Sequence, residues 1–134
     1  MFNTSEKVTV IIPTKNRPED LEQAVESVLV QCHLPNQLVI VDQSSNQSSK
    51  EKISALEMPE AIELTYIYNP SILGLVDAKR VGVENSLNEI ICFLEDDVVL
   101  NVKYISEIMI GFEKNASMIG CAGVISNQPN ISTL

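Results

Sequence analysis

Apolar and polar positions follow one another in short blocks that predict four strand–helix pairs and a last strand. The blocks expected to form strands are short and rich in β-branched residues, which is typical of strands buried on both faces. The blocks expected to form helices repeat their apolar positions every three or four residues. The predicted strands cover residues 8–13, 37–41, 62–68, 89–94 and 118–125, and the predicted helices cover 18–29, 50–56, 73–87 and 102–113.

The start of the first helix is marked by several residues. Pro18 is placed at the first helical position, where its fixed φ is favourable and its missing N–H costs nothing. Glu19 and Asp20 follow it, and acidic side chains are favourable near the positive end of the helix dipole. Asn16 is the expected N-cap, because its side chain can accept a hydrogen bond from a backbone N–H of the first turn.

The alternation of strands and helices predicts an α/β fold, with a mostly parallel sheet and helices on both faces. Rossmann-like sheets of this kind bind ligands beyond the carboxyl ends of their strands, where the strand order reverses. The loops after Ile12, Val41 and Leu94 are therefore expected to meet at one edge and to form the site. The 134 residues are expected to make a single domain, 1–134, whose sheet ends after about the fifth strand.

Composition narrows the range of partners. Nine Lys and Arg against 18 Asp and Glu give a net charge of −9 without a basic stripe, which argues against nucleic acid. No apolar run reaches the roughly 18 residues that a membrane span needs, and residues 1–7 lack the apolar core of a signal peptide. We therefore expect a cytoplasmic protein without a membrane span, or one peripheral to the inner membrane face.

Three adjacent carboxylates, Glu95, Asp96 and Asp97, follow a buried strand. Two like charges about 4 Å apart repel by about 1 kcal/mol in water and about 4 kcal/mol at an effective dielectric constant of about 20. A divalent cation such as Mg²⁺ or Mn²⁺ would remove this repulsion, and both prefer hard oxygen ligands. In an extended segment Glu95 and Asp97 point the same way, so they are the candidate metal ligands; a solvated acidic turn is the alternative.

Other polar residues near the predicted edge each allow two interpretations. Asp42, at the end of the second strand, could accept a hydrogen bond from a nucleobase or ribose, or could cap a turn. Arg17 could pair with a phosphate or lie in solvent, and Lys79 and Arg80 could reach a diphosphate or form an exposed helix face. The chain has neither a G-x-G-x-x-G nor a G-x-x-x-x-G-K-[ST] motif, which disfavours dinucleotide-binding Rossmann enzymes and P-loop NTPases.

Four segments, residues 8–18, 39–42, 74–82 and 93–98, follow one another in an order and spacing that is specific when taken together. They resemble, in turn, an opening strand and turn, a second strand with its base-binding aspartate, a Gly…Ala-Arg-Asn…Gly segment and a D-x-D motif. These are features of the family 2 glycosyltransferases, which have the GT-A fold. The resemblance runs from residue 8 to about residue 124 and so covers nearly the whole chain.

The resemblance implies a site for a nucleotide-diphosphate sugar with Mg²⁺ or Mn²⁺ as cofactor. It implies that Glu95 and Asp97 bind the metal and that Asp42 binds the nucleobase. Carried over by position, the residues that bind the nucleotide sugar are Pro13, Thr14, Asn16, Arg17, Asp42, Lys79 and Asp96. The chain departs from the family pattern at four residues: Glu95 replaces an Asp, Lys79 a frequent Arg, Arg80 an Asn, and Gln43 a frequent acidic residue.

The predicted function is binding of the donor within a metal-dependent glycosyltransferase that transfers sugar, with inversion, to an unknown glycan or lipid-linked acceptor. In this family the acceptor site and the general base lie beyond the D-x-D motif, in a half that this chain is expected to lack, so the catalytic residue is unknown. The chain alone is therefore expected to transfer sugar slowly or not at all. The alternative is a non-catalytic truncated GT-A module that binds a partner or forms a homodimer.

Overall fold

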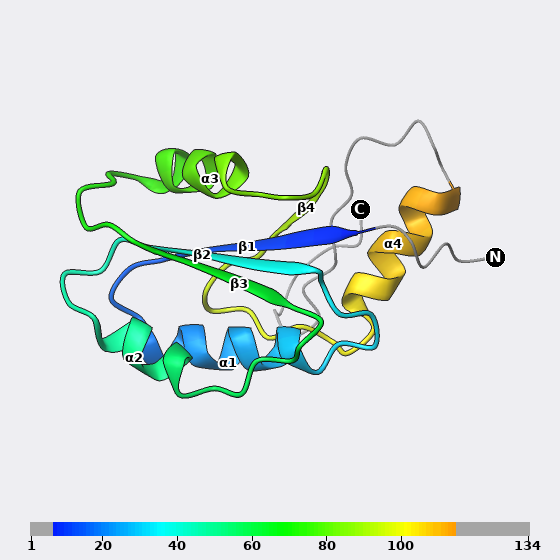
Figure 1. Ribbon diagram of the computed structural model, residues 1–134, viewed down its shortest axis with the longest axis horizontal. Coiled ribbons are helices and arrows are strands. Elements are labelled where there is room, and N and C mark those ends of the chain that lie inside the picture. Colours follow the sequence, from blue (N-terminus) through cyan, green and yellow to red (C-terminus); the bar gives the residue numbers. More distant parts are fainter. Residues whose placement is uncertain (1–6, 115–134) are drawn as a thin grey trace, which may run out of the picture.

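The computed structural model describes residues 7–114, which form one parallel sheet of strand order β3-β2-β1-β4 with helices on both faces. Figure 1 shows α3 on one face, α1 and α2 on the opposite face, and α4 beside the amino end of β1. The α/β fold with a parallel sheet is therefore confirmed, while the expected strand 118–125 lies outside the described residues. In chain order the elements are β1 (Val8–Thr14), α1 (Pro18–Leu29), β2 (Gln37–Asp42), α2 (Ser48–Ser54), β3 (Glu63–Tyr68), α3 (Leu75–Glu84), β4 (Ile90–Phe93) and α4 (Tyr104–Lys114).

Strand β1 lies between β2 and β4, and this position brings the three expected loops together. Its register pairs Thr14 with Asp42 on one side and Ile11 with Phe93 on the other. The backbone N–H of Leu94 donates to the carbonyl of Ile11 at 2.9 Å and extends the pairing one residue beyond β4. The loops after β1, β2 and β4 therefore leave the sheet side by side at its carboxyl edge, as predicted.

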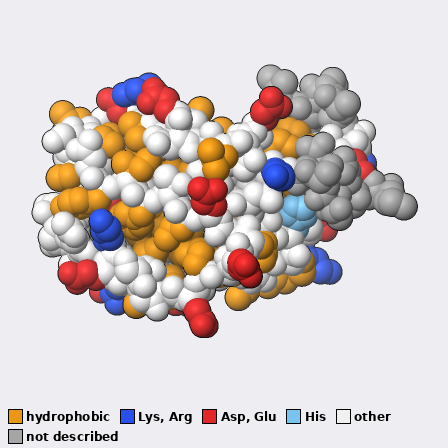
Figure 2. Space-filling view, viewed as in Figure 1, with side chains coloured by type: hydrophobic (Ala, Val, Ile, Leu, Met, Phe, Trp, Pro, Cys, Tyr) orange, Lys and Arg blue, Asp and Glu red, His pale blue; other side chains and the backbone are white. Residues whose placement is uncertain are grey.

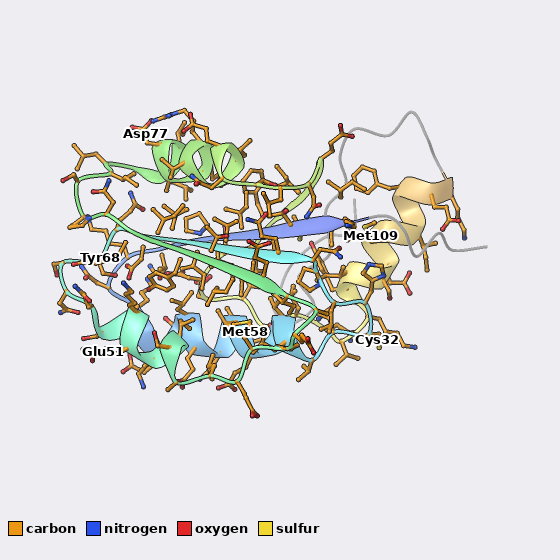
Figure 3. The ribbon with its side chains drawn as sticks, viewed as in Figure 1. Cys32, Glu51, Met58, Tyr68, Asp77 and Met109 are labelled. Carbon is orange, nitrogen blue, oxygen red and sulfur yellow. The ribbon has the colours of Figure 1, made fainter. Side chains whose placement is uncertain are left out.

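Two apolar layers enclose the sheet, because successive side chains of a strand point to opposite faces. Val10, Ile12 and Leu38 belong to the larger cluster, which includes side chains of α1 and α4, whereas Ile11 and Val39 join Ala78 of α3. Figure 3 shows these layers as side chains on either side of the strands, with Met109 of α4 and Tyr68 of β3 at opposite ends of the sheet. Figure 2 shows hydrophobic side chains over the region of β3, one of the two edge strands of the described sheet, which is only partly buried.

The cap of α1 and the end of α3 differ from the sequence prediction for local reasons. Helix α1 begins at Pro18 as predicted, but its N-cap is Arg17, so the prediction for Asn16 was wrong. Asn16 has a φ of 55°, and its side-chain oxygen accepts from the N–H of Ser45 at 3.0 Å. Helix α3 ends at Glu84, before the predicted residue 87, because the side chain of Asn85 donates to the carbonyl of Val81 at 2.8 Å.

Gly82 allows α3 to lie directly on β1. A Cβ atom at this position would lie 2.5 Å from Cγ2 of Ile11, a methyl group that is itself buried. Gly82→Ala is therefore expected to lower the free energy of unfolding by about 2 kcal/mol, since the cost of overpacking exceeds the gain in helix propensity. Urea denaturation measures the change, and a variant as stable as the native chain would contradict the packing argument.

Gly74→Ala is the matched control for this substitution. Gly74 has a φ of +84°, but no neighbouring atom lies within 4 Å of an added Cβ. Its cost is therefore expected to come from the backbone alone, at about 1–3 kcal/mol, because its ψ of 162° puts it in a region that is essentially confined to glycine.

Candidate functional site

A hollow of about 460 Å³ opens at the carboxyl edge of the sheet, where the loops after β1, β2 and β4 meet the first residue of α3. Its volume falls within the range of roughly 300–1,000 Å³ that is usual for small-molecule sites. The lining residues are Pro13, Thr14, Lys15, Arg17, Gln43, Leu75, Leu94, Glu95, Asp96 and Asp97.

The three carboxylates differ in exposure in the way the alternation predicts, since Asp96 is buried while Glu95 and Asp97 are exposed. The hydroxyl of Thr14 donates to Oδ2 of Asp96 at 2.9 Å. Nη1 of Arg17 lies 3.4 Å from Oδ1 of Asp96 and 3.6 Å from Oδ2 of Asp97. Arg17 was expected to meet a phosphate or solvent; in the structure it bridges two carboxylates and offsets part of their repulsion.

Burial and the neighbouring groups shift the pKa of Asp96 in opposite directions. Burial raises the pKa of this carboxyl, while the hydrogen bond from Thr14 and the charge of Arg17 oppose the rise. The net pKa lies above its usual value, because loss of hydration disfavours the charged form. Asp96 is thus an inward-facing anion held by protein groups, whereas Glu95 and Asp97 remain accessible.

The acidic segment is fixed to the core at both ends. Leu94 is bonded to β1, and the N–H of Leu100 donates to the hydroxyl of Ser27 on α1 at 3.0 Å. One residue further on, the side chain of Gln31 donates to the carbonyl of Asn101 at 2.7 Å. Helix α1 and strand β1 therefore set the positions of the carboxylates.

The donor chemistry of Glu95 and Asp97 fits a hard cation that also binds a phosphate. Among residues 7–114, no group of three or more His, Cys, Asp or Glu side chains is arranged to hold a metal. Mg²⁺ in phosphate sites is usually held by one or two carboxylates, with water and substrate oxygens completing its shell. The exposed pair Glu95 and Asp97 matches such an arrangement, and the described residues do not form a cage made of protein alone.

Asp42 caps a turn. It is fully buried, and its two oxygens accept hydrogen bonds from the hydroxyl of Tyr66 at 2.6 Å and from the N–H of Ser44 at 2.9 Å. Burial, together with the hydrogen bond to Asp42, raises the pKa of Tyr66 far above its usual value. Asp42 is not among the residues that line the hollow, so its role with the base stays a prediction.

Gln43, next to Asp42, is a lining residue that was not among the predicted site residues. Its backbone N–H donates to the carbonyl of Thr14 at 2.9 Å. Its side-chain nitrogen donates to the carbonyls of Ile72 and Gly74 at 2.9 and 3.0 Å. The predicted loop after Val41 already placed Gln43 near the site, but its side-chain partners lie 29 and 31 positions further along the chain, so no local pattern predicts these contacts.

Lys15, Leu75 and Leu94 are the other lining residues that were not among the predicted site residues. Lys15 directly follows Thr14, so the predicted position of the loop after β1 was a signal that could have found it. Leu75 is the first residue of α3, and only the packing of that helix brings it to the edge.

Three of the predicted site residues do not line the hollow: Asn16, Asp42 and Lys79. Asn16 instead connects the loops after β1 and β2 through Ser45. The ammonium group of Lys79 lies 5.2 Å from the centre of the Phe93 ring. The predicted residues that do line it are Pro13, Thr14, Arg17, Glu95, Asp96 and Asp97.

Comparison with known proteins identifies the family. The model of Glycosyl transferase family 2 matches residues 9–132. A glycosyltransferase of Rickettsia felis is 33% identical over 91 residues, which are 68% of this chain and 15% of that protein. The putative teichuronic acid biosynthesis glycosyltransferase TuaG of Bacillus subtilis is 30% identical over 98 residues, which are 72% of this chain and 38% of TuaG. The chain belongs to glycosyltransferase family 2.

Solved structures confirm the fold. TarS of S. aureus superimposes with a TM-score of 0.69 at 19% identity, covering 89% of this chain and 23% of TarS. The mannosyltransferase PcManGT from Pyrobaculum calidifontis, solved with GDP-Man and Mn²⁺, gives a TM-score of 0.61 at 21% identity and covers 72% of this chain and 30% of that protein. The chain thus spans well under half the length of these proteins. Between residues 7 and 114, no helix combines the length and apolar character needed to traverse a bilayer.

Proposed function

We propose that the hollow at the carboxyl edge binds the donor of a glycosyltransferase, a nucleotide-diphosphate sugar. The whole protein would transfer the sugar, with inversion, to a glycan or lipid-linked acceptor. The observation that carries the proposal is the convergence of Arg17, Asp96 and Asp97 at that edge in a chain of this family. A TarS structure solved with UDP-GlcNAc and the PcManGT structure with GDP-Man support a nucleotide sugar as the ligand.

Charge determines how an anionic diphosphate can enter the hollow. Its wall carries three carboxylates, Glu95, Asp96 and Asp97, against two cations, Lys15 and Arg17. Glu95 and Asp97 would hold Mg²⁺ or Mn²⁺, which when bound supplies positive charge to the diphosphate and to the leaving nucleotide. The Mn²⁺ in the PcManGT structure supports this choice of ion.

The chain's own residues would complete the binding of the diphosphate. The guanidinium of Arg17 can leave the carboxylate of Asp97 and bind a phosphate instead, since it can form paired hydrogen bonds with either anion. Thr14 keeps Asp96 turned inward, which leaves Glu95 and Asp97 accessible. Pro13 and Leu94 supply apolar wall beside these charges.

Titration of the chain with UDP, GDP and dTDP, with and without Mn²⁺, tests the proposal. We expect binding that requires Mn²⁺, and Asp97→Asn is expected to weaken it by at least about tenfold, because one charged ligand of a hard cation is removed. Asp77→Asn is the control, since Asp77 is exposed on α3 and does not line the hollow. Metal-independent binding, or equal loss in both variants, would contradict the assignment of the carboxylates.

A second function is supported by exposed apolar side chains around α3. Leu73, Val76 and Leu87 are 76%, 81% and 65% exposed. Apolar surface of this kind is typical of interfaces, so a non-catalytic module that forms homodimers is the alternative. Light scattering across a concentration series decides this point: a mass that stays monomeric rules out the dimer, and a dimer that binds no nucleotide favours the module.

A further inference from the structure

Strand β3 lies at an edge of the sheet, and one row of its backbone groups is unpaired. The backbone N–H groups of Glu63 and Asn69 both donate at 2.9 Å to carbonyls on the side of β2. Backbone groups of successive residues point to opposite sides of a strand, so the even-numbered residues of β3 face away from the sheet. Among the described residues, these outward N–H and carbonyl groups have no hydrogen-bond partner. The residues that carry them are Leu64, Tyr66 and Tyr68.

Strand β3 lacks the features that usually protect an edge strand. Natural edge strands are short, or carry Pro, Lys or a bulge, and these features prevent pairing with another chain. The sequence of β3 contains neither Pro nor Lys, and the strand pairs with β2 in one continuous register over all 6 residues. Its one charged residue, Glu63, is at its first position. The edge is therefore a surface on which a further strand can pair.

Apolar side chains follow the free edge on both faces of the sheet. Leu64 and Tyr66, with Met58 from the preceding loop, are only partly buried against the larger core cluster. Ile67 is likewise partly buried, against the smaller cluster on the face of α3. Figure 2 shows hydrophobic side chains gathered over this part of the molecule. A strand paired with β3 would remove part of this apolar surface from water, which favours association.

We propose that β3 of one chain pairs antiparallel with β3 of a second copy, about a twofold axis at Tyr66, so that two sheets become one. In this register Tyr66 lies opposite Tyr66 and Leu64 lies opposite Tyr68, and all outward backbone groups of both strands find partners. Thr65 lies opposite Ile67, and pairs of β-branched residues are favourable across strands. The edge is thus complementary to itself, as a twofold interface requires.

The charges at the two ends of β3 also complement each other in this register. Glu60 and Glu63 lie at its amino end, where they line a second hollow. Helix α2 carries Lys50 and Lys52 against one Glu and lies on the side of the carboxyl ends of the strands (Figure 1). Among the described residues, none of these four side chains has an ion pair. Antiparallel pairing brings the acidic end of each chain toward the positively charged helix of the other.

The proposed seam is separate from the hollow at the carboxyl edge. The hollow is lined by the loops after β1, β2 and β4 and by the start of α3, and no residue of β3 lines it. The inference therefore does not rest on the proposed function, and a dimer formed through β3 leaves both hollows open.

Light scattering across a concentration series tests the pairing on the full chain. The mass of the native chain is expected to rise with concentration from one chain toward two. Tyr68→Pro removes an outward N–H that the symmetric pair uses twice, and it leaves the bonds between β3 and β2 in place, since proline is tolerated where the N–H faces away from the sheet. Tyr68→Val is the matched control, because it loses the same ring and keeps the N–H. The dimer of Tyr68→Pro is expected to be weaker than that of Tyr68→Val by about tenfold or more.

Disulfide formation in mixed chains tests the register, and it does not depend on the folding of the proline variant. Glu63 is expected to lie opposite Asn69 of the second copy in a pair without mutual hydrogen bonds, with Cα atoms about 4.5 Å apart, which a disulfide can bridge. The background carries Cys32→Ser and Cys121→Ser. A mixture of Glu63→Cys and Asn69→Cys chains is expected to cross-link, whereas either chain alone is not, because its two cysteines lie about 20 Å apart.

Three results would overturn the inference: a native chain that stays monomeric, a dimer equally stable in Tyr68→Pro and Tyr68→Val, or cross-linking that is the same in mixed and single chains. A dimer that persists in Tyr68→Pro and is lost in Val76→Ser would use the apolar side chains around α3 and would overturn it as well. Failure of the proposed function is a separate result, namely a native chain that binds none of UDP, GDP and dTDP.

Discussion

Replacing Gln37 with methionine is expected to lower the free energy of unfolding by about 3 kcal/mol, because four hydrogen-bonding groups lose their partner inside the protein. Gln37 is 1% exposed. Its side-chain oxygen accepts from the hydroxyl of Thr9 at 2.9 Å and from the N–H of Leu87 at 2.8 Å. Its nitrogen donates to the hydroxyl of Thr65 at 3.0 Å and to the carbonyl of Asn85 at 2.9 Å.

Methionine fits this position in size but offers no comparable hydrogen bonds, so the substitution isolates the polar contribution. The measurement is urea denaturation, with the dependence on urea concentration checked for a constant slope. Gln23→Met serves as the control, since Gln23 is exposed on α1. A loss below about 1 kcal/mol would mean that water replaces Gln37 for these partners.

Tyr66→Phe is expected to lower the free energy of unfolding by about 2 kcal/mol at neutral pH, because a fully buried carboxylate loses a charge-assisted hydrogen bond. The hydroxyl of Tyr66 donates to Oδ2 of Asp42 at 2.6 Å, and only the N–H of Ser44 then remains as a donor to Asp42 among the described residues. The double variant Asp42→Ala with Tyr66→Phe is expected to lose less than the sum of the single variants, since neither group is left unpaired.

The raised pKa of Tyr66 also allows a prediction of how the free energy of unfolding changes at alkaline pH. Burial and the nearby Asp42 raise the pKa of Tyr66, so the folded chain keeps this proton where an unfolded tyrosine releases it. The stability that Tyr66 contributes is complete below a pH of about 10 and falls above it by about 1.4 kcal/mol per pH unit. Tyr66→Phe removes this dependence.

Tyr68→Phe is the control for both measurements, since Tyr68 belongs to the same strand and its hydroxyl has no hydrogen bond within residues 7–114. Stability of the two variants is compared between pH 8 and a pH of about 11, above the ordinary pKa of tyrosine. Equal alkaline losses in the two variants would refute the role of Tyr66.

The position of the site could be predicted because it follows from the type of sheet. Continuous apolar strands that alternate with helices indicate a parallel sheet, and its ligands lie beyond the carboxyl ends. The polar groups after Ile12 and Leu94 were therefore expected to meet, and Thr14 and Asp96 are in contact. The exposure of Glu95, Asp96 and Asp97 matches the predicted alternation, but the physical reason differs: Asp96 and Asp97 lie in a turn, in which the N–H of Val98 donates to the carbonyl of Glu95 at 3.3 Å, and not in an extended chain.

The roles of single polar residues could not be predicted, because distant partners decide them. A glutamine at the end of an apolar run is typical of the protein surface, yet Gln37 and Gln43 are both buried. The partners of Gln37 lie 28 to 50 positions along the chain. The left-handed backbone of Asn16 likewise accompanies its contact with Ser45, so Arg17 and not Asn16 is the N-cap of α1, although the helix still begins at Pro18.

The two anchors of the acidic segment limit which insertions, deletions and substitutions this part of the sequence can accept. Residues 95–99 connect two fixed points, the bond from Leu94 to Ile11 and the bond from Leu100 to Ser27. One inserted or deleted residue must displace either the carboxylates or the start of α4, whereas a new side chain at Val99, which is 63% exposed, displaces neither. Sequence libraries built on this scaffold should therefore keep the length of this connection constant and vary only its outward-facing side chains.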